Sequence, residues 1–372
     1  MRVGVDELTA VQMAFGLCMV LFGAELFTNG VEWLGVKLRL GEGAVGSVLA
    51  ALGTALPETA VPMTAIVLGG GEADQVGMGG ILGAPFLLAT LGGLVLALAA
   101  VLFRTGHPAG GMAVSSRAFL RDLAFFLVGF SLSLAPAAWP APWFKASVAC
   151  LLIGWYVVFV RAHLRDGDRA ESAPDLRPLY LNRRHGHPAA VAVLAQIALA
   201  VLIVVAGAHL LTKGVESVAA ERAVPAFVLS ALVVPLATEL PETLNSVLWM
   251  RDRKDALAVG NITGAMVFQG TLVPAIGMLL TDWTFTRTAW WTAGLTVAAA
   301  SYLLMAVHLA SRVEPWMLVV PSIAYFAFPL VAFQLHALSP SARLALVAAM
   351  LASSALCAAL WVRSRRDLPP RR

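Results

Sequence analysis

The chain has 372 residues, of which 59% are hydrophobic and 13% charged, and its mean hydropathy is +0.81. A soluble domain carries about 25% charged residues, so this composition excludes an ordinary soluble protein. The formal net charge of +4 gives no argument for nucleic-acid binding. We expect Cys18, Cys150 and Cys357, which all lie in apolar segments, to be small buried hydrophobic residues without disulfides.

Apolar stretches of roughly 20 residues recur along the whole chain, which is typical of transmembrane helices. We therefore expect an all-α polytopic membrane protein with ten or eleven transmembrane helices. In chain order, the predicted spans are residues 9–35, 43–69, 76–103, 118–137, 143–161, 189–212, 223–250, 257–281, 288–311, 315–335 and 341–362.

A polar connection rich in Arg, Asp and Pro divides the predicted spans into two halves. We predict a first five-helix repeat at 1–162, a cytoplasmic linker loop at 163–188 and a second, inverted five-helix repeat at 189–336. Residues 337–372 are expected to add one extra C-terminal helix and a basic tail. Because each repeat has an odd number of spans, the second enters the membrane with the opposite orientation.

The positions of Lys and Arg orient the predicted spans. An N-terminus outside the cell and a cytoplasmic C-terminus leave 20 of the 26 Lys and Arg residues on the inside. The positive-inside rule favours this orientation, in the inner membrane of the cell. The six basic residues left outside are Arg2, Lys145, Lys213, Arg222, Arg287 and Arg343.

Three sequence blocks recur in the same order in both halves, which indicates an internal duplication. The first two recur with an offset of 184 residues and the third with an offset of 181. The pairs are 23–32 with 207–216, 54–59 with 238–243, and 79–84 with 260–265.

The middle block is a Thr-x-Leu-Pro-Glu-Thr motif inside a long apolar run. Proline removes one helix hydrogen bond and displaces the carbonyl group four residues earlier, which belongs to Gly53 or Ala237. Each copy thus offers a backbone oxygen, the hydroxyl of Thr54 or Thr238, and a carboxylate. Hard cations such as Ca²⁺ and Na⁺ prefer oxygen ligands of this kind. A plain helix kink is the alternative interpretation of either proline.

Glu58 and Glu242 are the carboxylates of the two copies. An ionisable group deep in a membrane span is a functional-site hypothesis by default, and we expect this pair to bind the metal cation. The alternative is a carboxylate kept protonated or hydrogen-bonded for packing. Glu239 lies near the same helix face as Glu242, as a ligand, a proton carrier or a satisfied buried group.

The third block is rich in glycine, which lets helices approach closely. Packing is the expected role of Gly79, Gly83, Gly260 and Gly264. Asn261 lines the site or makes a structural hydrogen bond, and Gln269 is expected to face the site. Glu25, Glu32 and Glu216 are expected at peripheral positions.

At these residues the chain resembles the cation/Ca²⁺ antiporter superfamily, which contains the sodium/calcium exchangers and their prokaryotic relatives. That family has two inverted repeats, each with Gly-Thr-Ser-Leu-Pro-Glu followed by Gly-Asn-x-x-Gly-Ser-x-x-x-Asn, with Asp sometimes at the last position. The first motif is matched at 53–58 and 237–242, and the second at 79–88 and 260–269. The resemblance implies that Thr54, Glu58, Thr238 and Glu242 are cation ligands.

Several family ligands are replaced in this chain. The Ser of the first motif is Ala55 in one half and Glu239 in the other, while the terminal Asn or Asp of the second motif is Leu88 and Gln269. The Ser of the second motif is alanine in both halves. The chain thus loses hydroxyl and amide ligands and gains an acid, which favours proton coupling or an altered stoichiometry.

We therefore expect a secondary active antiporter that exchanges Ca²⁺ for Na⁺ or H⁺ by alternating access at a midplane site. Its expected partners are small inorganic cations and the lipid bilayer, without nucleic acid and without a cofactor. The alternatives are an H⁺-coupled antiporter of another cation, a channel-like pathway and a degenerate paralogue that transports nothing. No nucleophile–base pattern in the sequence favours an enzyme.

Overall fold

In a computed structural model, the structure describes residues 3–38, 55–69, 73–103, 112–165, 177–182 and 188–332. These residues form helices and short connections, with one isolated backbone bridge between Leu179 and Asn182. The all-α prediction is thereby confirmed. The first part of the second predicted span and the whole eleventh span lie outside the described residues, as does most of the predicted linker loop.

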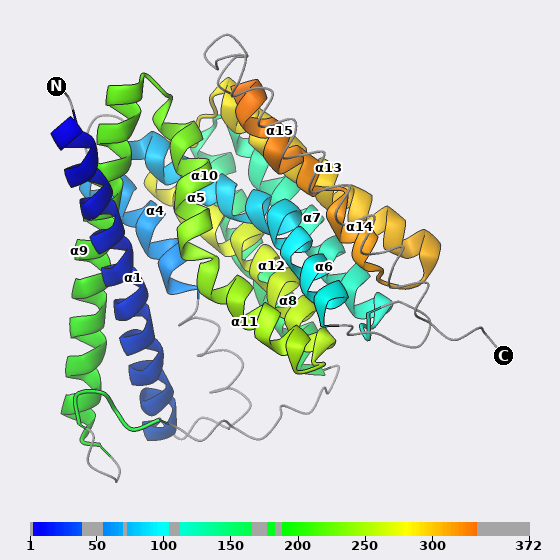
Figure 1. Ribbon diagram of the computed structural model, residues 1–372, viewed down its shortest axis with the longest axis horizontal. Coiled ribbons are helices and arrows are strands. Elements are labelled where there is room, and N and C mark those ends of the chain that lie inside the picture. The colour runs from blue at the N-terminus through cyan, green and yellow to red at the C-terminus, as the bar shows by residue number, and fades with distance from the viewer. Residues whose placement is uncertain are drawn as a thin grey trace. The chain divides into compact units, whose positions relative to one another are not determined.

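The helices follow the predicted spans closely (Figure 1). Those of the first half are α1 (Val3–Lys37), α4 (Leu56–Leu68), α5 (Ala73–Leu87), the π-helix η2 (Leu88–Gly92), α6 (Gly93–Leu102), α7 (Ser116–Ala138) and α8 (Pro142–Arg165). Those of the second half are α9 (Ala190–Arg222), α10 (Ala226–Thr238), α11 (Leu240–Arg251), α12 (Asp255–Leu280), α13 (Arg287–Ala310), α14 (Pro315–Val319) and α15 (Ser322–Ala332).

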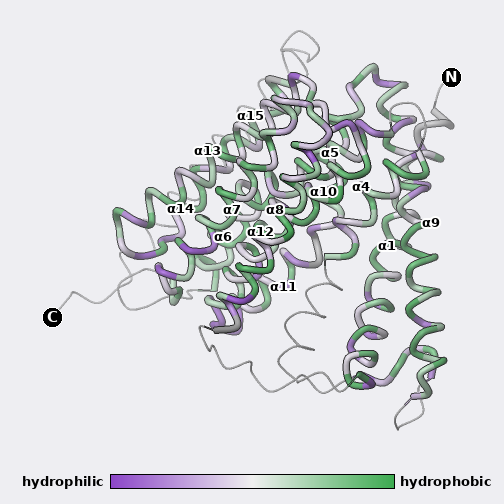
Figure 2. Tube along the Cα trace, turned by 180° about the vertical axis from the view of Figure 1, so that it is seen from behind, coloured by the Kyte–Doolittle hydropathy of each residue, from purple (hydrophilic) through white to green (hydrophobic). Residues whose placement is uncertain are grey.

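Seven helical spans of the described residues are long and apolar enough to cross a membrane, and the number is eight if the bent pair α10–α11 counts as one span. Figure 2 shows hydrophobic residues along the whole length of α1 and α9. Hydroxyl side chains mark the start of two spans, since Ser115 accepts a hydrogen bond from the third residue beyond it and so does Thr286.

The chain forms two compact units, each with helices from both halves of the sequence. Residues 1–80 and 160–230 make the first unit, in which α4 packs against α9 and α1. Residues 81–159 and 231–372 make the second unit, in which α12 packs against α7 and α11. The predicted repeat boundaries cut across these units and stay a prediction.

Helices α1 and α9 lie side by side and run in opposite directions (Figure 1). Their backbones nearly touch: a Cβ atom on Gly16 would lie 2.8 Å from the carbonyl oxygen of Gly207. Further along the pair, a Cβ on Gly23 would lie 3.1 Å from the carbonyl oxygen of Ala200. Only glycine permits these approaches, so the glycines of the first repeated block have a packing role.

The contacts between α1 and α9 are two-fold symmetric in the numbering of the repeat. In the repeat, Gly16 corresponds to Ala200 and Gly207 corresponds to Gly23, each with the offset of 184 residues. The contact of Gly16 with Gly207 is therefore equivalent to the contact of Gly23 with Ala200, and both are present. The same shift exchanges Gly30 against Ile197 for Gly214 against Met13, and both contacts are present. Two side-chain hydrogen bonds are related by the same offset, because Gln12 donates to the carbonyl oxygen of Leu210 and Gln196 donates to the carbonyl oxygen of Leu26. This symmetry supports an inverted repeat.

The expected burial of the cysteines is wrong for Cys18 and Cys150, whose side chains are exposed on α1 and α8. A membrane-spanning helix turns apolar residues outward to lipid, so an apolar run does not imply burial inside the protein. Cys357 lies outside the described residues.

Replacing Gly16 with Val is expected to destabilise the folded protein by about 1–3 kcal/mol, because the added carbons meet the backbone of α9. Gly154 of α8, with no atom within 4 Å of an added Cβ, provides the control Gly154→Val with the same intrinsic helix cost. Thermal unfolding in detergent measures the difference. Equal melting temperatures for the two variants would contradict the close contact.

Candidate cation site

The second Pro-Glu motif lies at a break between two helices. Helix α10 ends at Thr238 and α11 begins at Leu240, with an angle of 45° between their axes. Pro241 stands in the first turn of α11, where its missing N–H is tolerated. The same absent N–H denies the carbonyl of Ala237 its regular helix partner. The motif thus places irregular backbone in the middle of an apolar span, as predicted.

The first motif begins a helix in the same way. Pro57 stands in the first turn of α4, and Thr59 Oγ1 donates to the carbonyl oxygen of Ala55 at 2.9 Å. In the second motif, Thr243 Oγ1 donates to the carbonyl oxygen of Glu239 at 2.8 Å. The last Thr of each motif therefore closes the first turn of its helix, and its hydroxyl proton is used within the helix.

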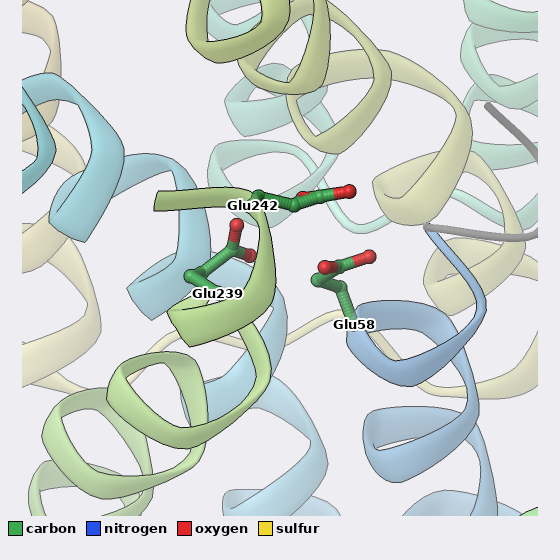
Figure 3. A group of neighbouring side chains, drawn as sticks. All are labelled: Glu58, Glu239 and Glu242. Carbon is green, nitrogen blue, oxygen red and sulfur yellow. The ribbon is translucent and has the colours of Figure 1, made fainter. Parts of the chain in front are cut away.

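The glutamates of the two motifs are all buried, and Figure 3 shows their side chains. In the second unit, a carboxylate oxygen of Glu239 and one of Glu242 lie within 4.8 Å of each other. Their exposed fractions are 1% and 6%. Two carboxylates this close in an apolar interior repel each other strongly unless a proton or a cation lies between them.

Gln269 of α12 completes this cluster in the second unit. Its Nε2 donates to Glu239 Oε1 at 2.6 Å, and the residue is 1% exposed. Glu239 Oε2 and Gln269 Oε1 are buried and accept no hydrogen bond from any described residue. Unsatisfied oxygens of this kind are costly in an apolar interior, so they point to a ligand that the protein itself does not supply.

Asn261 of α12 holds α11 in place beside the glutamates. Its Nδ2 donates to the backbone carbonyl oxygen of Glu242 at 3.3 Å and to Ser246 Oγ at 3.2 Å. Of the two roles expected for this asparagine, the structural hydrogen bond is therefore observed. Through it, the glycine-rich block of α12 fixes the backbone that carries Glu242.

The structure places the other predicted site residues as follows. Glu58 is buried in the first turn of α4, 3% exposed, in the first unit. Thr238 is buried at the end of α10, and its Oγ1 donates to the carbonyl oxygen of Val234. Thr54 and Gly53 lie outside the described residues.

The packing role expected of the glycine-rich blocks is observed at Gly83 but, among the described residues, not at Gly260 or Gly264. A Cβ on Gly83 would lie 2.4 Å from the carbonyl oxygen of Ala231, which confirms close packing there. At Gly260 and Gly264, no atom of the described residues lies within 4 Å of an added Cβ. Close approach to a described helix therefore does not explain these two glycines.

Sequence reasoning missed a further buried carboxylate, on α7. Asp122 of α7 is buried, and Thr263 Oγ1 of α12 donates to its Oδ2 at 2.8 Å. Arg121 contacts the other carboxylate oxygen at 3.2 Å. Asp122 ties α7 to α12 on a different side from Asn261. Its position inside an apolar span was the signal that would have found it.

Removing the hydroxyl group of Thr263 is expected to destabilise the protein by about 1–3 kcal/mol, since Asp122 then loses a buried donor. The variant Thr263→Val keeps the shape of the side chain, and Thr263→Ser keeps the hydroxyl group as a matched control. Thermal unfolding should show a lower melting temperature for the valine variant alone. Equal losses in both variants would mean that the hydrogen bond does not carry the effect.

The chain matches the family model described as sodium/calcium exchanger protein over residues 8–162 and 192–334. It is 23% identical over 299 residues to CaxA of Alkalimonas amylolytica, an antiporter by name, covering 79% of this chain and 86% of CaxA.

Two solved structures share the fold. The crystal structure of the H⁺/Ca²⁺ exchanger CAX is similar with a TM-score of 0.67 and 16% identity, over 97% of this chain and 89% of CAX. The sodium-calcium exchanger NCX_Mj, soaked with zero Na⁺ and Ca²⁺, is similar with a TM-score of 0.51 and 17% identity, over 88% of this chain and 99% of NCX_Mj. These likenesses agree with the polytopic helical fold predicted from the sequence.

Proposed function

Because this chain belongs to the sodium/calcium exchanger protein family, and is therefore a multi-pass membrane transporter rather than an enzyme, we propose that it exchanges Ca²⁺ for H⁺. Exchangers of this family transport cations and need no cofactor. The observation that supports the proposal most directly is the buried pair of Glu239 and Glu242, with Gln269 hydrogen-bonded to the first.

Protons and Ca²⁺ compete for this pair. With a divalent cation between them, both carboxylates are ionised and their repulsion is offset. Without it, at least one of two buried carboxylates within 4.8 Å holds a proton, because two bare charges cannot be buried together. Ca²⁺ binding thus releases protons, and protonation releases Ca²⁺. This exclusion is the coupling that an antiporter requires.

The proposed ligand set consists of hard oxygen donors. Glu239 Oε2 and Gln269 Oε1 are two buried oxygens of this cluster that accept no hydrogen bond from a described residue. Glu242 adds a second carboxylate, and by the repeat Glu58 adds the carboxylate of the first half. Backbone oxygens of Ala237 and Gly53 and the hydroxyl groups of Thr238 and Thr54 are further proposed ligands, as the family resemblance implies.

The choice of H⁺ over Na⁺ follows from the residues that differ from the family pattern. Glu239 stands where the family has a serine hydroxyl, and Gln269 stands where it has Asn or Asp. A carboxylate carries a proton readily, whereas the lost hydroxyl groups are ligands that a Na⁺ site needs. In the proposed cycle, the site opens alternately to the two sides of an inner membrane, with the N-terminus outside.

Replacing Glu242 or Glu58 with Gln is expected to lower Ca²⁺ uptake by about 100-fold or more, because one ligand charge disappears from a buried site. Glu216→Gln is the matched control, since Glu216 pairs with Lys213 on α9 rather than with the cluster. Uptake is measured in proteoliposomes with each variant at equal reconstituted amount. Normal uptake by Glu58→Gln would exclude that residue from the site.

Ca²⁺ uptake driven in parallel by an outward H⁺ gradient and by an outward Na⁺ gradient tests the coupling ion. We expect uptake with H⁺ alone, and a loss of this uptake by about 100-fold in Glu239→Gln, which cannot release a proton. Na⁺-driven uptake by the wild type, or H⁺-driven uptake at the wild-type rate in Glu239→Gln, would contradict proton coupling through Glu239. If neither gradient drives uptake, Ca²⁺ is not the cation that the protein transports.

A further inference from the structure

Four residues in the first half of α12 are half-buried and form a continuous strip along the helix. They are Gly260, Asn261, Gly264 and Ala265, and we call them the open strip. A Cβ atom added to Gly260 or Gly264 would have no atom of the described residues within 4 Å. Packing within the second unit therefore leaves space beside both glycines.

The open strip lies between the two sides of α12 that are hydrogen-bonded to neighbouring helices. On one side, Thr263 donates to the carboxylate of Asp122 on α7 at 2.8 Å. On the other side, Asn261 donates to the backbone carbonyl oxygen of Glu242 on α11 at 3.3 Å. With about 3.6 residues per turn, the two glycines of the strip point in directions between those of Thr263 and Asn261. The space beside the glycines is thus bordered by α7 and by α11.

Polar side chains accompany the open strip on the side of α11. Asn261 is half-buried and donates to Ser246 Oγ at 3.2 Å. Asn245, the neighbour of Ser246 on α11, is exposed. A side-chain amide exposed to hydrocarbon at membrane depth is costly, so polar groups there face either protein or a water-filled space. These amides therefore favour water over lipid as the content of the space.

The open strip leads to the amide and carboxylate of the proposed site. Asn261, Ala265 and Gln269 are spaced four residues apart and therefore lie on one face of α12. Exposure falls along this face, from half-buried at the first two residues to 1% at Gln269. Gln269 Oε1 and Glu239 Oε2 are buried and accept no hydrogen bond from a described residue. The strip thus ends at oxygens that are available to a ligand.

The equivalent residues of the first half are closed. With the offset of 181 residues, the strip corresponds to Gly79, Gly80, Gly83 and Ala84 of α5, and all four are buried. A Cβ atom on Gly83 would lie 2.4 Å from the carbonyl oxygen of Ala231. The same motif is packed in one copy and open in the other, so the motif alone does not set the opening. In an inverted repeat, the two copies face opposite sides of the membrane.

We propose that the open strip is one wall of a water-filled passage, through which the cation reaches Glu239 and Gln269 from the end of α12 where that helix begins. Gly260 and Gly264 keep the passage wide, because a side chain at either position would occupy it. The inference rests on the proposed function, which supplies the cation. The predicted orientation places this end of α12 in the cytoplasm. The packed counterpart on α5 corresponds to the closed route from the opposite face, as alternating access requires.

Accessibility to a charged reagent tests whether water fills the passage. Gly260→Cys and Gly264→Cys are made in a background in which all three native cysteines are replaced by Ala. A membrane-impermeant cationic methanethiosulfonate is then added to the face of proteoliposomes at which α12 begins. We expect both variants to react at least about tenfold faster than Gly154→Cys, because a thiol in hydrocarbon does not form the reactive thiolate.

Gly154 of α8 is a matched control for the labelling. An added Cβ there also has no atom within 4 Å, but the neighbouring exposed side chains on the same helix face, Leu151 and Val158, are apolar. This face of α8 is thus suited to lipid. Reaction of the two strip variants as slowly as Gly154→Cys would show that the open strip faces lipid and would overturn the proposal.

A bulky side chain tests whether the cation uses the passage. Gly264→Leu is expected to lower Ca²⁺ uptake by about tenfold or more, since the width of a passage limits what crosses it. Its melting temperature should stay close to that of Gly154→Leu, because the added carbons enter open space, and Gly154→Leu should transport at the wild-type rate. Wild-type uptake by a folded Gly264→Leu would overturn the proposal.

The labelling does not depend on transport, so the two proposals can fail separately. If the wild type carries no Ca²⁺ while both strip variants react rapidly, the proposed function is wrong and the water-filled passage is supported. If the wild type carries Ca²⁺ while neither strip variant reacts, the passage is wrong and the proposed function is unaffected. The cysteine variants add little volume, so they decide the question even where Gly264→Leu does not fold.

Discussion

The burial of carboxylates inside an apolar, membrane-spanning helical protein is the constraint on which the rest of the structure depends. A bare charge in such an interior is costly, so each acid must find a donor, a proton or a cation. Glu239 finds the amide of Gln269, while the backbone that carries Glu242 is fixed by Asn261. Helix α12 supplies both amides, and Asp122 holds α12 from the side of α7. The helix break at Pro241 brings Glu239 and Glu242 close together, and the side-chain amides of Gln269 and Asn261 on α12 hold them in position.

A second constraint is the close approach of α1 and α9. Glycines replace side chains at each crossing point, and the glutamines donate across to carbonyl groups of the opposite helix. Helices in lipid gain little from the hydrophobic effect, so such backbone contacts and interhelical hydrogen bonds carry much of the association. The symmetric spacing of the contacts explains why the same Gly-Ala-x-Leu-x-Thr-x-Gly pattern recurs in both halves of the sequence.

Hydropathy and repeated motifs predicted the helical fold, the span limits and the acids at the helix break, because each of these features is local in sequence. The proximity of Glu239 and Gln269 was also predictable from the sequence, because both are polar residues in apolar segments. Other features depend on contacts between distant residues and leave no periodic signal. These include the Asp122–Thr263 hydrogen bond and the docking of residues 177–182 on Asn29 and Gln196. The exposed cysteines show a further limit, because hydropathy does not tell a lipid-facing residue from an interior one.

The symmetry of the α1–α9 contact has a consequence for how such a protein can be assembled. The glycine contacts and the glutamine-to-carbonyl hydrogen bonds between the helices each occur twice, with the two partners exchanged, which is the property of an isologous interface in a homodimer. A half-length chain inserted in the membrane in both orientations would make the same contacts between its two copies. The interface itself therefore does not require fusion into a single polypeptide. Fusion adds a connecting segment, and that segment supplies the one property that an isologous pair lacks, a difference between its two ends.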